Sequence, residues 1–175
     1  FREDVREAAK ETRRLMVYFG QDGCPYCRQL MQVNFGDKSL ADKTQRHFSA
    51  VAVNIWGDRE VTWTDGRTLS EKALAVRLKV QFTPTLLFFD EKGAVVLRLN
   101  GYYPPNQLHA ALDYVSYALA VEELNRVDGS VGITMWAHNS LCTNHIALFG
   151  SPAQKAAYLP RLARGAALGA WGLTE

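Results

Sequence analysis

Two cysteines stand two residues apart in the stretch 23–27 (GCPYC), which follows the apolar run of residues 15–19. Thiols at this spacing can close into a small disulfide and open again. If a helix begins at or near Cys24, its unpaired backbone N–H groups and its dipole favour a thiolate there. Cys27 lies one turn further in, more shielded and placed to attack a mixed disulfide formed on Cys24. The pattern therefore predicts a redox-active pair in which Cys24 is the attacking thiol.

A Cys-x-x-Cys pair can alternatively supply half of a zinc site or a structural bridge. Zinc needs two more ligands, and no second Cys-x-x-Cys or paired histidine follows at the usual spacing. Elsewhere, His138, Cys142 and His145 are spaced so that they share one face of a predicted helix. A fourth ligand is not apparent and that face is otherwise apolar, so we expect no metal there.

The composition excludes some classes of partner. The chain has 175 residues, 47% of them hydrophobic, and a formal net charge of +2. This apolar content suffices for the core of one domain or of a domain and a half. The charge is too small to indicate nucleic acid or an anionic membrane as a partner, and the apolar runs are too short for a membrane span. Because the sequence starts at Phe1 rather than Met, it is compatible with a removed export signal.

Hydrophobic periodicity predicts helices and strands in alternation around the cysteine pair. A helix over residues 1–13 precedes a strand over 14–20, whose apolar run is typical of a sheet buried on both faces. The other predicted elements are helices over 24–36, 39–45, 70–78 and 104–119, strands over 48–56, 86–89 and 94–99, and a polar loop over 57–67. The order β-α-β-α-β-β-α predicts an α/β fold with a mixed four-stranded sheet and helices on both faces.

Three signals in these elements carry a family resemblance. The Cys-Pro-Tyr-Cys motif follows a buried strand, Thr83-Pro84 stands before the third strand, and Gly101 follows the fourth. In these respects the chain resembles a thioredoxin-fold thiol–disulfide oxidoreductase. In that family the proline before the third strand is cis, a rare and deliberate feature, and the residue before it binds the substrate backbone. The resemblance therefore implies that Thr83 and Pro84, together with Pro25 and Tyr26, bind a protein substrate.

The resemblance covers residues 1–119, and the phrases MVYFGQDGCPYC and FTPTLLFFDEKG are similar to those of exported, periplasmic thioredoxin-like proteins. It implies a periplasmic location, protein thiols or disulfides as substrates, a redox partner, and no cofactor besides the Cys24–Cys27 disulfide. One position departs from the family, because thioredoxins carry a buried Asp where this chain has Tyr18. A phenol, with a pKa of about 10, is a poor base at neutral pH. We therefore expect proton removal from Cys27 to rely on water or on Lys and Glu side chains.

Residues 120–175 continue without a flexible linker and do not belong to that fold. The break at residues 128–130 predicts a new, largely apolar helix over 131–149, and Ser151-Pro152 starts another. A short apolar strand is expected over residues 166–173. The sequence thus predicts an α-helical hairpin segment after the α/β domain.

This segment resembles the end of the helical N-terminal domain of an acyl-CoA dehydrogenase. The matching phrases are EEL-x-R-x-D-x-S over residues 122–130 and FG-x-x-x-QK-x-x-YLP-x-L-x-x-G over residues 149–165, followed by LTE. In that family the stretch equivalent to Trp171, Gly172, Leu173 and Thr174 lies along the flavin. The middle β-domain and the domain with the catalytic carboxylate do not follow in this sequence. The resemblance therefore implies FAD binding only if further domains complete the segment, and no dehydrogenase activity without them.

Two functions stay open on the sequence alone. The chain is either an enzyme with a complete thiol–disulfide site in residues 1–119, or a binding module whose role residues 120–175 define. In the second case a cytoplasmic location is implied. In either case the apolar faces of residues 131–164 lack their usual partners, so we expect them to dock on the thioredoxin-like domain or to self-associate. The join is alternatively an accidental fusion of two genes, which leaves the redox site intact.

Overall fold

The computed structural model describes residues 1–170, and the chain divides into two compact units, residues 1–116 and residues 117–175. The first unit contains a mixed sheet of four strands in the order β2-β1-β5-β6. The strands are β1 (Arg14–Gly20), β2 (Phe48–Asn54), β5 (Thr85–Phe89) and β6 (Val95–Asn100). Strand β1 pairs parallel with β2 and antiparallel with β5, and β5 pairs antiparallel with β6. The mixed four-stranded sheet predicted from the sequence is therefore confirmed.

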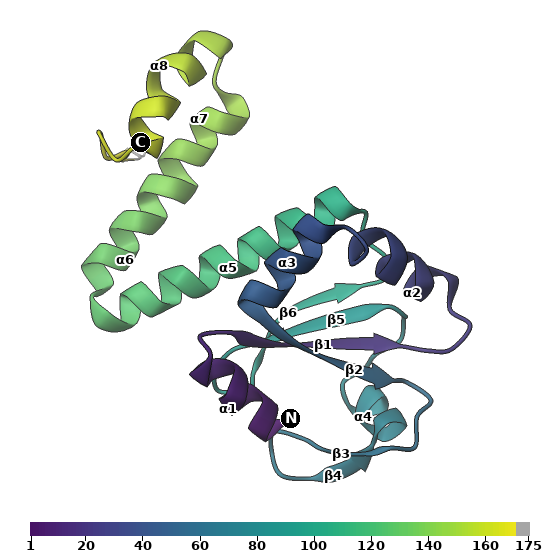
Figure 1. Ribbon diagram of the computed structural model, residues 1–175. Helices are drawn as coiled ribbons and strands as arrows, with labels where there is room; N and C mark the ends of the chain where they lie inside the picture. Colours follow the sequence, from purple (N-terminus) through teal and green to yellow (C-terminus); the bar gives the residue numbers. More distant parts are fainter. Residues whose placement is uncertain (171–175) are drawn as a thin grey trace. The chain divides into compact units, whose positions relative to one another are not determined.

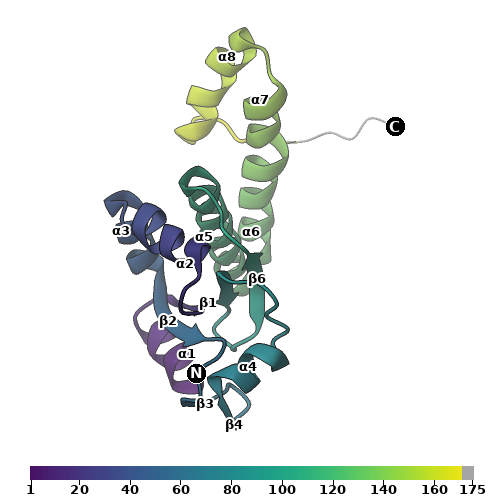
Figure 2. The same ribbon diagram turned by 90° about the vertical axis from the view of Figure 1, so that its right-hand side faces the viewer.

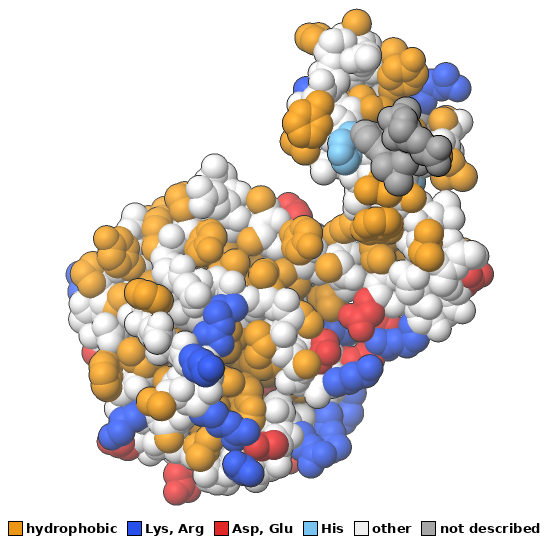
Figure 3. Space-filling view, turned by 180° about the vertical axis from the view of Figure 1, so that it is seen from behind, with side chains coloured by type: hydrophobic (Ala, Val, Ile, Leu, Met, Phe, Trp, Pro, Cys, Tyr) orange, Lys and Arg blue, Asp and Glu red, His pale blue; other side chains and the backbone are white. Residues whose placement is uncertain are grey.

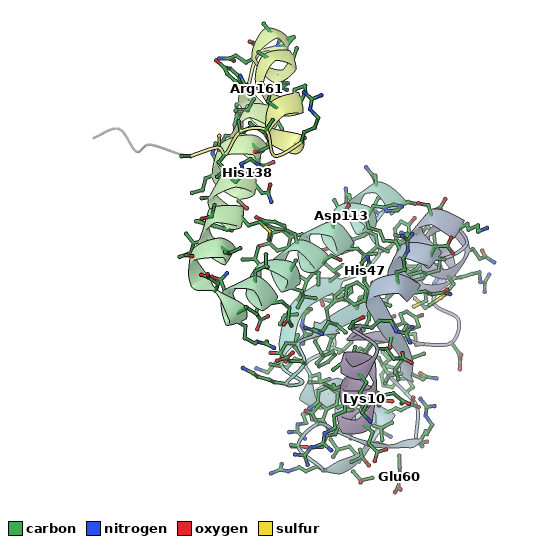
Figure 4. All side chains as sticks on the ribbon, turned by 60° about the vertical axis from the view of Figure 1, so that its left-hand side comes forward. Lys10, His47, Glu60, Asp113, His138 and Arg161 are labelled. Carbon is green, nitrogen blue, oxygen red and sulfur yellow. The ribbon has the colours of Figure 1, made fainter. Side chains whose placement is uncertain are left out.

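Helices cover both faces of this sheet (Figure 1, Figure 2). They are α1 (Arg2–Lys10), α2 (Pro25–Gln29), the π-helical segment η1 (Leu30–Asn34), α3 (Lys38–His47), α4 (Glu71–Arg77) and the start of α5 (Pro105–Val127). Helices α1 and α4 lie on one face, and α2, α3 and α5 lie on the other (Figure 1). An ion pair between Lys43 and Asp113 joins α3 to α5 on the second face (Figure 4).

The side chains of β1 alternate between the two faces of the sheet, because side chains along a strand repeat with a period of two. Val17 and Phe19 are fully buried in one apolar cluster with Leu87 of β5 and with side chains of α1 and α4. Met16 and Tyr18 belong to the opposite face, the one that carries α2 and α3. The near-continuous apolar run in the sequence thus reflects burial of both faces.

The sequence predicts a polar loop over residues 57–67, and this prediction is wrong for residues 60–62. Strand β3 (Glu60–Thr62) pairs antiparallel with β4 (Thr68–Ser70) in a separate two-stranded sheet. Trp63, next to this pairing, is buried, and its ring centroid lies 5.1 Å from that of Phe1 and 5.6 Å from that of Phe89. The polar composition of the stretch gave no sign of a hairpin. The buried Trp63 side chain anchors this hairpin to the core.

The second unit is helical in its described part. After α5 it contains α6 (Gly129–Trp136), the π-helical segment η2 (Ala137–Thr143), α7 (Asn144–Phe149) and α8 (Pro152–Ala163). Asp128 caps α6 by accepting the N–H of Ser130 at 2.8 Å, and Ser151 forms a capping box with Gln154 at the start of α8. The predicted helical segment is therefore confirmed. The expected domain boundary at residues 119 and 120 lies within the continuous helix α5.

The strand expected over residues 166–173 is not formed in its described part, residues 166–170. The N–H of Gly169 donates to Nδ1 of His138 at 2.9 Å, so this segment lies against a helix rather than along a strand. Residues 171–173 lie outside the described part of the chain. Across residues 1–170, no helix has both the length and the apolar character that a membrane crossing requires.

We expect Leu74→Ala to lower the free energy of unfolding by about 2–5 kcal/mol, because it removes a buried side chain from α4 and leaves a cavity. Leu74 is fully buried, whereas Val76 on the same helix is 75% exposed. Val76→Ala should change the stability by less than about 0.5 kcal/mol. Urea denaturation followed by tryptophan fluorescence measures both, and equal losses would contradict the burial of Leu74.

Candidate active site

The turn after β1 places Cys24 at the N-cap of α2. Gly23 precedes it with φ +74°, a conformation that glycine adopts at no steric cost, and Pro25 occupies the first helical position. Cys24 Sγ accepts the backbone N–H of Cys27 at 3.1 Å, which satisfies one donor that the helix start leaves unpaired. Both thiols are buried, with exposed fractions of 8% for Cys24 and 5% for Cys27. The prediction that a helix begins at or near Cys24 is confirmed.

The loop before β5 brings Thr83 against Cys24. The Thr83–Pro84 peptide bond is cis, as the resemblance implied. The Thr83 hydroxyl donates to Cys24 Sγ at 3.5 Å, and the Cys24 thiol donates to the Thr83 carbonyl oxygen at 3.6 Å. Thr83 is half-buried and Pro84 is buried. The structure thus gathers Cys24, Cys27 and Thr83 in one contact group, with Pro84 next to it in the chain.

Exposed apolar side chains stand in the segments that adjoin the thiol pair. Pro25 and Tyr26 lie between the cysteines and are exposed, and Phe82 next to Thr83 is 60% exposed. Trp56 is 67% exposed, and its indole N–H donates to the side-chain oxygen of Gln21 at 2.6 Å. This hydrogen bond ties Trp56 to the turn that precedes Cys24.

The surroundings of Cys24 favour its thiolate. Burial by itself raises the pKa of this thiol. Hydrogen bonds from the Cys27 thiol, the Thr83 hydroxyl and the backbone N–H groups of Cys27 and Tyr26 outweigh burial. The net result is a pKa below the ordinary thiol value, so Cys24 is the thiol that ionises first.

Cys27 is held in its protonated form. Burial raises its pKa, and its hydrogen bond to Cys24 raises that pKa further, because ionisation would remove the donated proton. Hydrogen bonds from the Tyr18 hydroxyl, the Gln21 backbone and the Thr83 hydroxyl oppose this rise without reversing it. The pair therefore separates a nucleophilic sulfur on Cys24 from a proton-bearing sulfur on Cys27.

Tyr18 contacts Cys27 from the position at which the family carries an Asp. Its hydroxyl forms a hydrogen bond with Cys27, and burial together with this bond raises the pKa of the phenol. The alternation of β1 offered a signal, because Tyr18 lies on the face that carries α2. The poor basicity of a phenol excludes Tyr18 as a proton acceptor, but it does not exclude Tyr18 as a hydrogen-bond donor.

The metal candidate in the second unit does not assemble. In the part of the chain that the structure describes, no group of three or more His, Cys, Asp and Glu side chains could hold a metal ion. His138 accepts a hydrogen bond from Gly169 instead (Figure 4). The stretch proposed to match a flavin contact, Trp171 to Thr174, lies outside the described residues.

A Cys-x-x-Cys pair at the start of a helix, in contact with a cis-proline loop beside a mixed four-stranded sheet, defines a thioredoxin-fold dithiol protein. The family model of the thioredoxin-like domain matches residues 1–116. The chain therefore belongs to the thioredoxin-like family.

Solved structures agree with this assignment. A thioredoxin-fold protein from Helicobacter pylori is 32% identical, covers 59% of this chain and 69% of its own, and has a TM-score of 0.52. A thioredoxin from Thermus thermophilus is 28% identical, with coverage of 66% and 83% and a TM-score of 0.53. A putative disulphide-isomerase from Bacteroides thetaiotaomicron is 28% identical, with coverage of 68% and 87% and a TM-score of 0.52.

A second family matches a later part of the chain, which overlaps the first match. The model of the acyl-CoA dehydrogenase N-terminal domain matches residues 97–166. A mitochondrial isovaleryl-CoA dehydrogenase from Oryza sativa subsp. japonica is 41% identical over 78 residues, which are 44% of this chain. A short-chain specific acyl-CoA dehydrogenase from Megasphaera elsdenii is 54% identical over 63 residues, 36% of this chain. The matched regions span only 19% and 16% of the length of these relatives.

We expect Thr83→Val to raise the pKa of Cys24, because the lost hydroxyl donor stabilises the thiolate. Alkylation of Cys24 by iodoacetamide at neutral pH should slow about two- to tenfold, the equivalent of one hydrogen bond. The pH profile of alkylation, with the modified cysteine identified by peptide mass spectrometry, measures this effect. Thr68→Val on β4 is the matched control and should leave the profile in place. An unshifted profile in Thr83→Val would contradict the contact between the hydroxyl and the sulfur.

Proposed function

We propose that the chain is a thiol–disulfide oxidoreductase that exchanges the Cys24–Cys27 disulfide with thiols of other proteins. One observation carries this proposal: Cys24 has a lowered pKa and contacts Cys27, which keeps its proton. The first sulfur is suited to attack, and the second is in place to resolve the product. Membership of the thioredoxin-like family supports the same reaction.

In the reducing direction the reaction has two steps. The Cys24 thiolate attacks one sulfur of a substrate disulfide, forms a mixed disulfide, and releases the other substrate sulfur as a thiolate that takes up a proton. Cys27 then loses its proton to water, and its thiolate attacks Cys24 Sγ. The second substrate sulfur leaves and is protonated in turn. Two electrons pass to the substrate and the Cys24–Cys27 disulfide forms, so no further cofactor is required, and the reverse sequence oxidises a substrate dithiol.

A protein is the substrate that the surroundings of Cys24 favour. Exposed apolar side chains stand in three segments that adjoin the thiol pair, and they offer contact area to a polypeptide: Tyr26 between the cysteines, Phe82 next to Thr83, and Trp56, which is bonded to Gln21. Thr83 and Pro84 form the loop that contacts Cys24, and we assign the binding of substrate backbone to them, with Pro25 and Tyr26 on the helix side. A redox partner of the same chemical class restores the dithiol or the disulfide.

For its location we propose the periplasm, on the resemblance of the cysteine and proline motifs to those of exported thioredoxin-like proteins. If the acyl-CoA dehydrogenase-like segment defines the protein, we propose the cytoplasm instead. Fractionation of the source cells, with an antibody against residues 1–116, distinguishes the two locations.

We expect Cys24→Ser to reduce the rate of insulin disulfide reduction by about a hundredfold or more, because the thiolate is the attacking group. Cys27→Ser should retain the attack and accumulate a mixed disulfide, since the resolving sulfur is lost. Cys142→Ser is the control and should keep the wild-type rate. Non-reducing electrophoresis and mass spectrometry detect the trapped species. Trapping by Cys24→Ser rather than by Cys27→Ser would reverse the two roles.

A second candidate function belongs to the helical unit, which carries many exposed hydrophobic side chains. The large hydrophobic side chains that are exposed in this unit are Val127, Val131, Ile133, Trp136, Leu148, Phe149, Tyr158 and Leu168. Figure 3 shows hydrophobic side chains in orange on one face of the molecule. Such a surface favours association with another protein or with a second copy of the chain through residues 131–164.

We expect the chain to bind no FAD and to show no acyl-CoA dehydrogenase activity. The match spans less than a fifth of the relatives, and a flavin site needs walls on both sides of the ring and groups for the pyrophosphate. Titration of FAD with the purified chain, followed by quenching of flavin fluorescence, tests binding, and butyryl-CoA with an artificial acceptor tests turnover. Stoichiometric quenching would overturn this expectation and identify a working cofactor site.

A further inference from the structure

Tyr18 reaches the resolving thiol from the central strand of the sheet. Tyr18 and Gly20 belong to β1, and the turn that leads to Cys24 begins directly after Gly20. Residues two apart on a strand share a face. The hydroxyl of Tyr18 forms a hydrogen bond with the Cys27 side chain. The ring therefore extends along the strand toward the turn.

Gly20 leaves the space that this ring occupies. A Cβ atom at Gly20 would lie 2.2 Å from the Tyr18 hydroxyl oxygen and 2.5 Å from the ring carbon that bears it. Any side chain at this position would displace the hydroxyl. The pair Tyr18 and Gly20 thus forms one unit, in which the missing side chain of Gly20 permits the hydrogen bond to Cys27.

The Tyr18 hydroxyl is able to donate a hydrogen bond to Cys27. Burial and the neighbouring sulfurs raise the pKa of the phenol above its ordinary value, so it keeps its proton at neutral pH. The same contact lowers the pKa of Cys27, as expected for a donor that faces a thiolate. A phenol that keeps its proton does not accept the proton of Cys27, but it can stabilise the negative charge that remains on the sulfur.

We infer that Tyr18 is a catalytic residue of the resolving step, in which its hydroxyl donates a hydrogen bond to the Cys27 thiolate as that thiolate attacks Cys24. Gly20 is the positioning residue that lets the hydroxyl reach the sulfur. This inference rests on the proposed thiol–disulfide exchange and assigns a residue to its second step.

The groups around Cys27 change between the two steps. In the free dithiol, Cys24 at the N-cap of α2 holds the proton of Cys27 by accepting it in a hydrogen bond. In the mixed disulfide Cys24 carries no charge, so this opposition to the ionisation of Cys27 ends. The Tyr18 hydroxyl from β1, the Thr83 hydroxyl from the loop before β5 and the Gln21 backbone are then the donors to the thiolate. Tyr18 therefore matters most after Cys24 has reacted.

The test uses the reduced full-length chain with Cys142→Ser, so that only the pair reacts with 5,5′-dithiobis(2-nitrobenzoate). Attack by Cys24 releases one nitrothiobenzoate ion, and attack by Cys27 on the mixed disulfide releases the second. Stopped-flow absorbance separates the two releases as a function of pH. Tyr18→Phe should leave the first rate within about twofold and slow the second about tenfold near neutral pH, the effect of one hydrogen bond to a charged group. The pH midpoint of the second release should move upward.

Two further variants isolate the hydroxyl. Tyr114→Phe removes a hydroxyl from an exposed tyrosine on α5 and should change neither rate. Gly20→Ala should reproduce the slow second release of Tyr18→Phe, provided that circular dichroism shows the folded state. A second release in Tyr18→Phe with the wild-type rate and pH midpoint, or equal slowing of both releases, would overturn the role of Tyr18. If the unsubstituted pair gives no second release at all, the proposed exchange itself fails.

Discussion

The hydrogen bond from the Cys27 backbone N–H to Cys24 Sγ, 3.1 Å long, is the interaction on which the redox site depends. It makes one sulfur part of the helix start and sets the other sulfur three residues further along the helix, on the same face. The asymmetry of the pair follows from this geometry. Cys24 Sγ accepts hydrogen bonds from the helix start and from Thr83, while the Cys27 thiol donates a hydrogen bond to Cys24. Two chemically identical side chains thereby acquire different roles.

Sequence patterns predicted those parts of the site that are local in the chain. The apolar run of β1, the glycine turn and the spacing of the cysteines placed the thiol pair at a helix start, because each of these features acts within a few residues. The cis bond before Pro84 followed from a resemblance and not from periodicity. The pairing of Thr83 with Cys24 spans 59 residues, so only a known fold could suggest it.

The features that the sequence did not predict depend on packing between distant elements. Trp63 stands among polar residues, and its burial against Phe1 and Phe89 becomes evident only when three segments are assembled. Tyr18 looked like a poor substitute for a carboxylate because only its acidity was considered. Its function as a donor requires the open space over Gly20 and the position of Cys27, and neither is encoded in the spacing of residues.

Helix α5 explains how two unrelated sequence families can share one chain without a linker. An α-helix satisfies its own backbone hydrogen bonds within each turn, so a sequence can change its family without leaving a break. The two family models both include residues 97–116, the region where one match ends and the other begins. Leu108, Leu112 and Val115 are the buried residues of α5, and the helix buries no side chain fully beyond them. The contacts found for the two thiols all come from residues 18–83, within the first unit. The proposed association of the second unit therefore rests on a separate feature of the chain, its exposed apolar side chains.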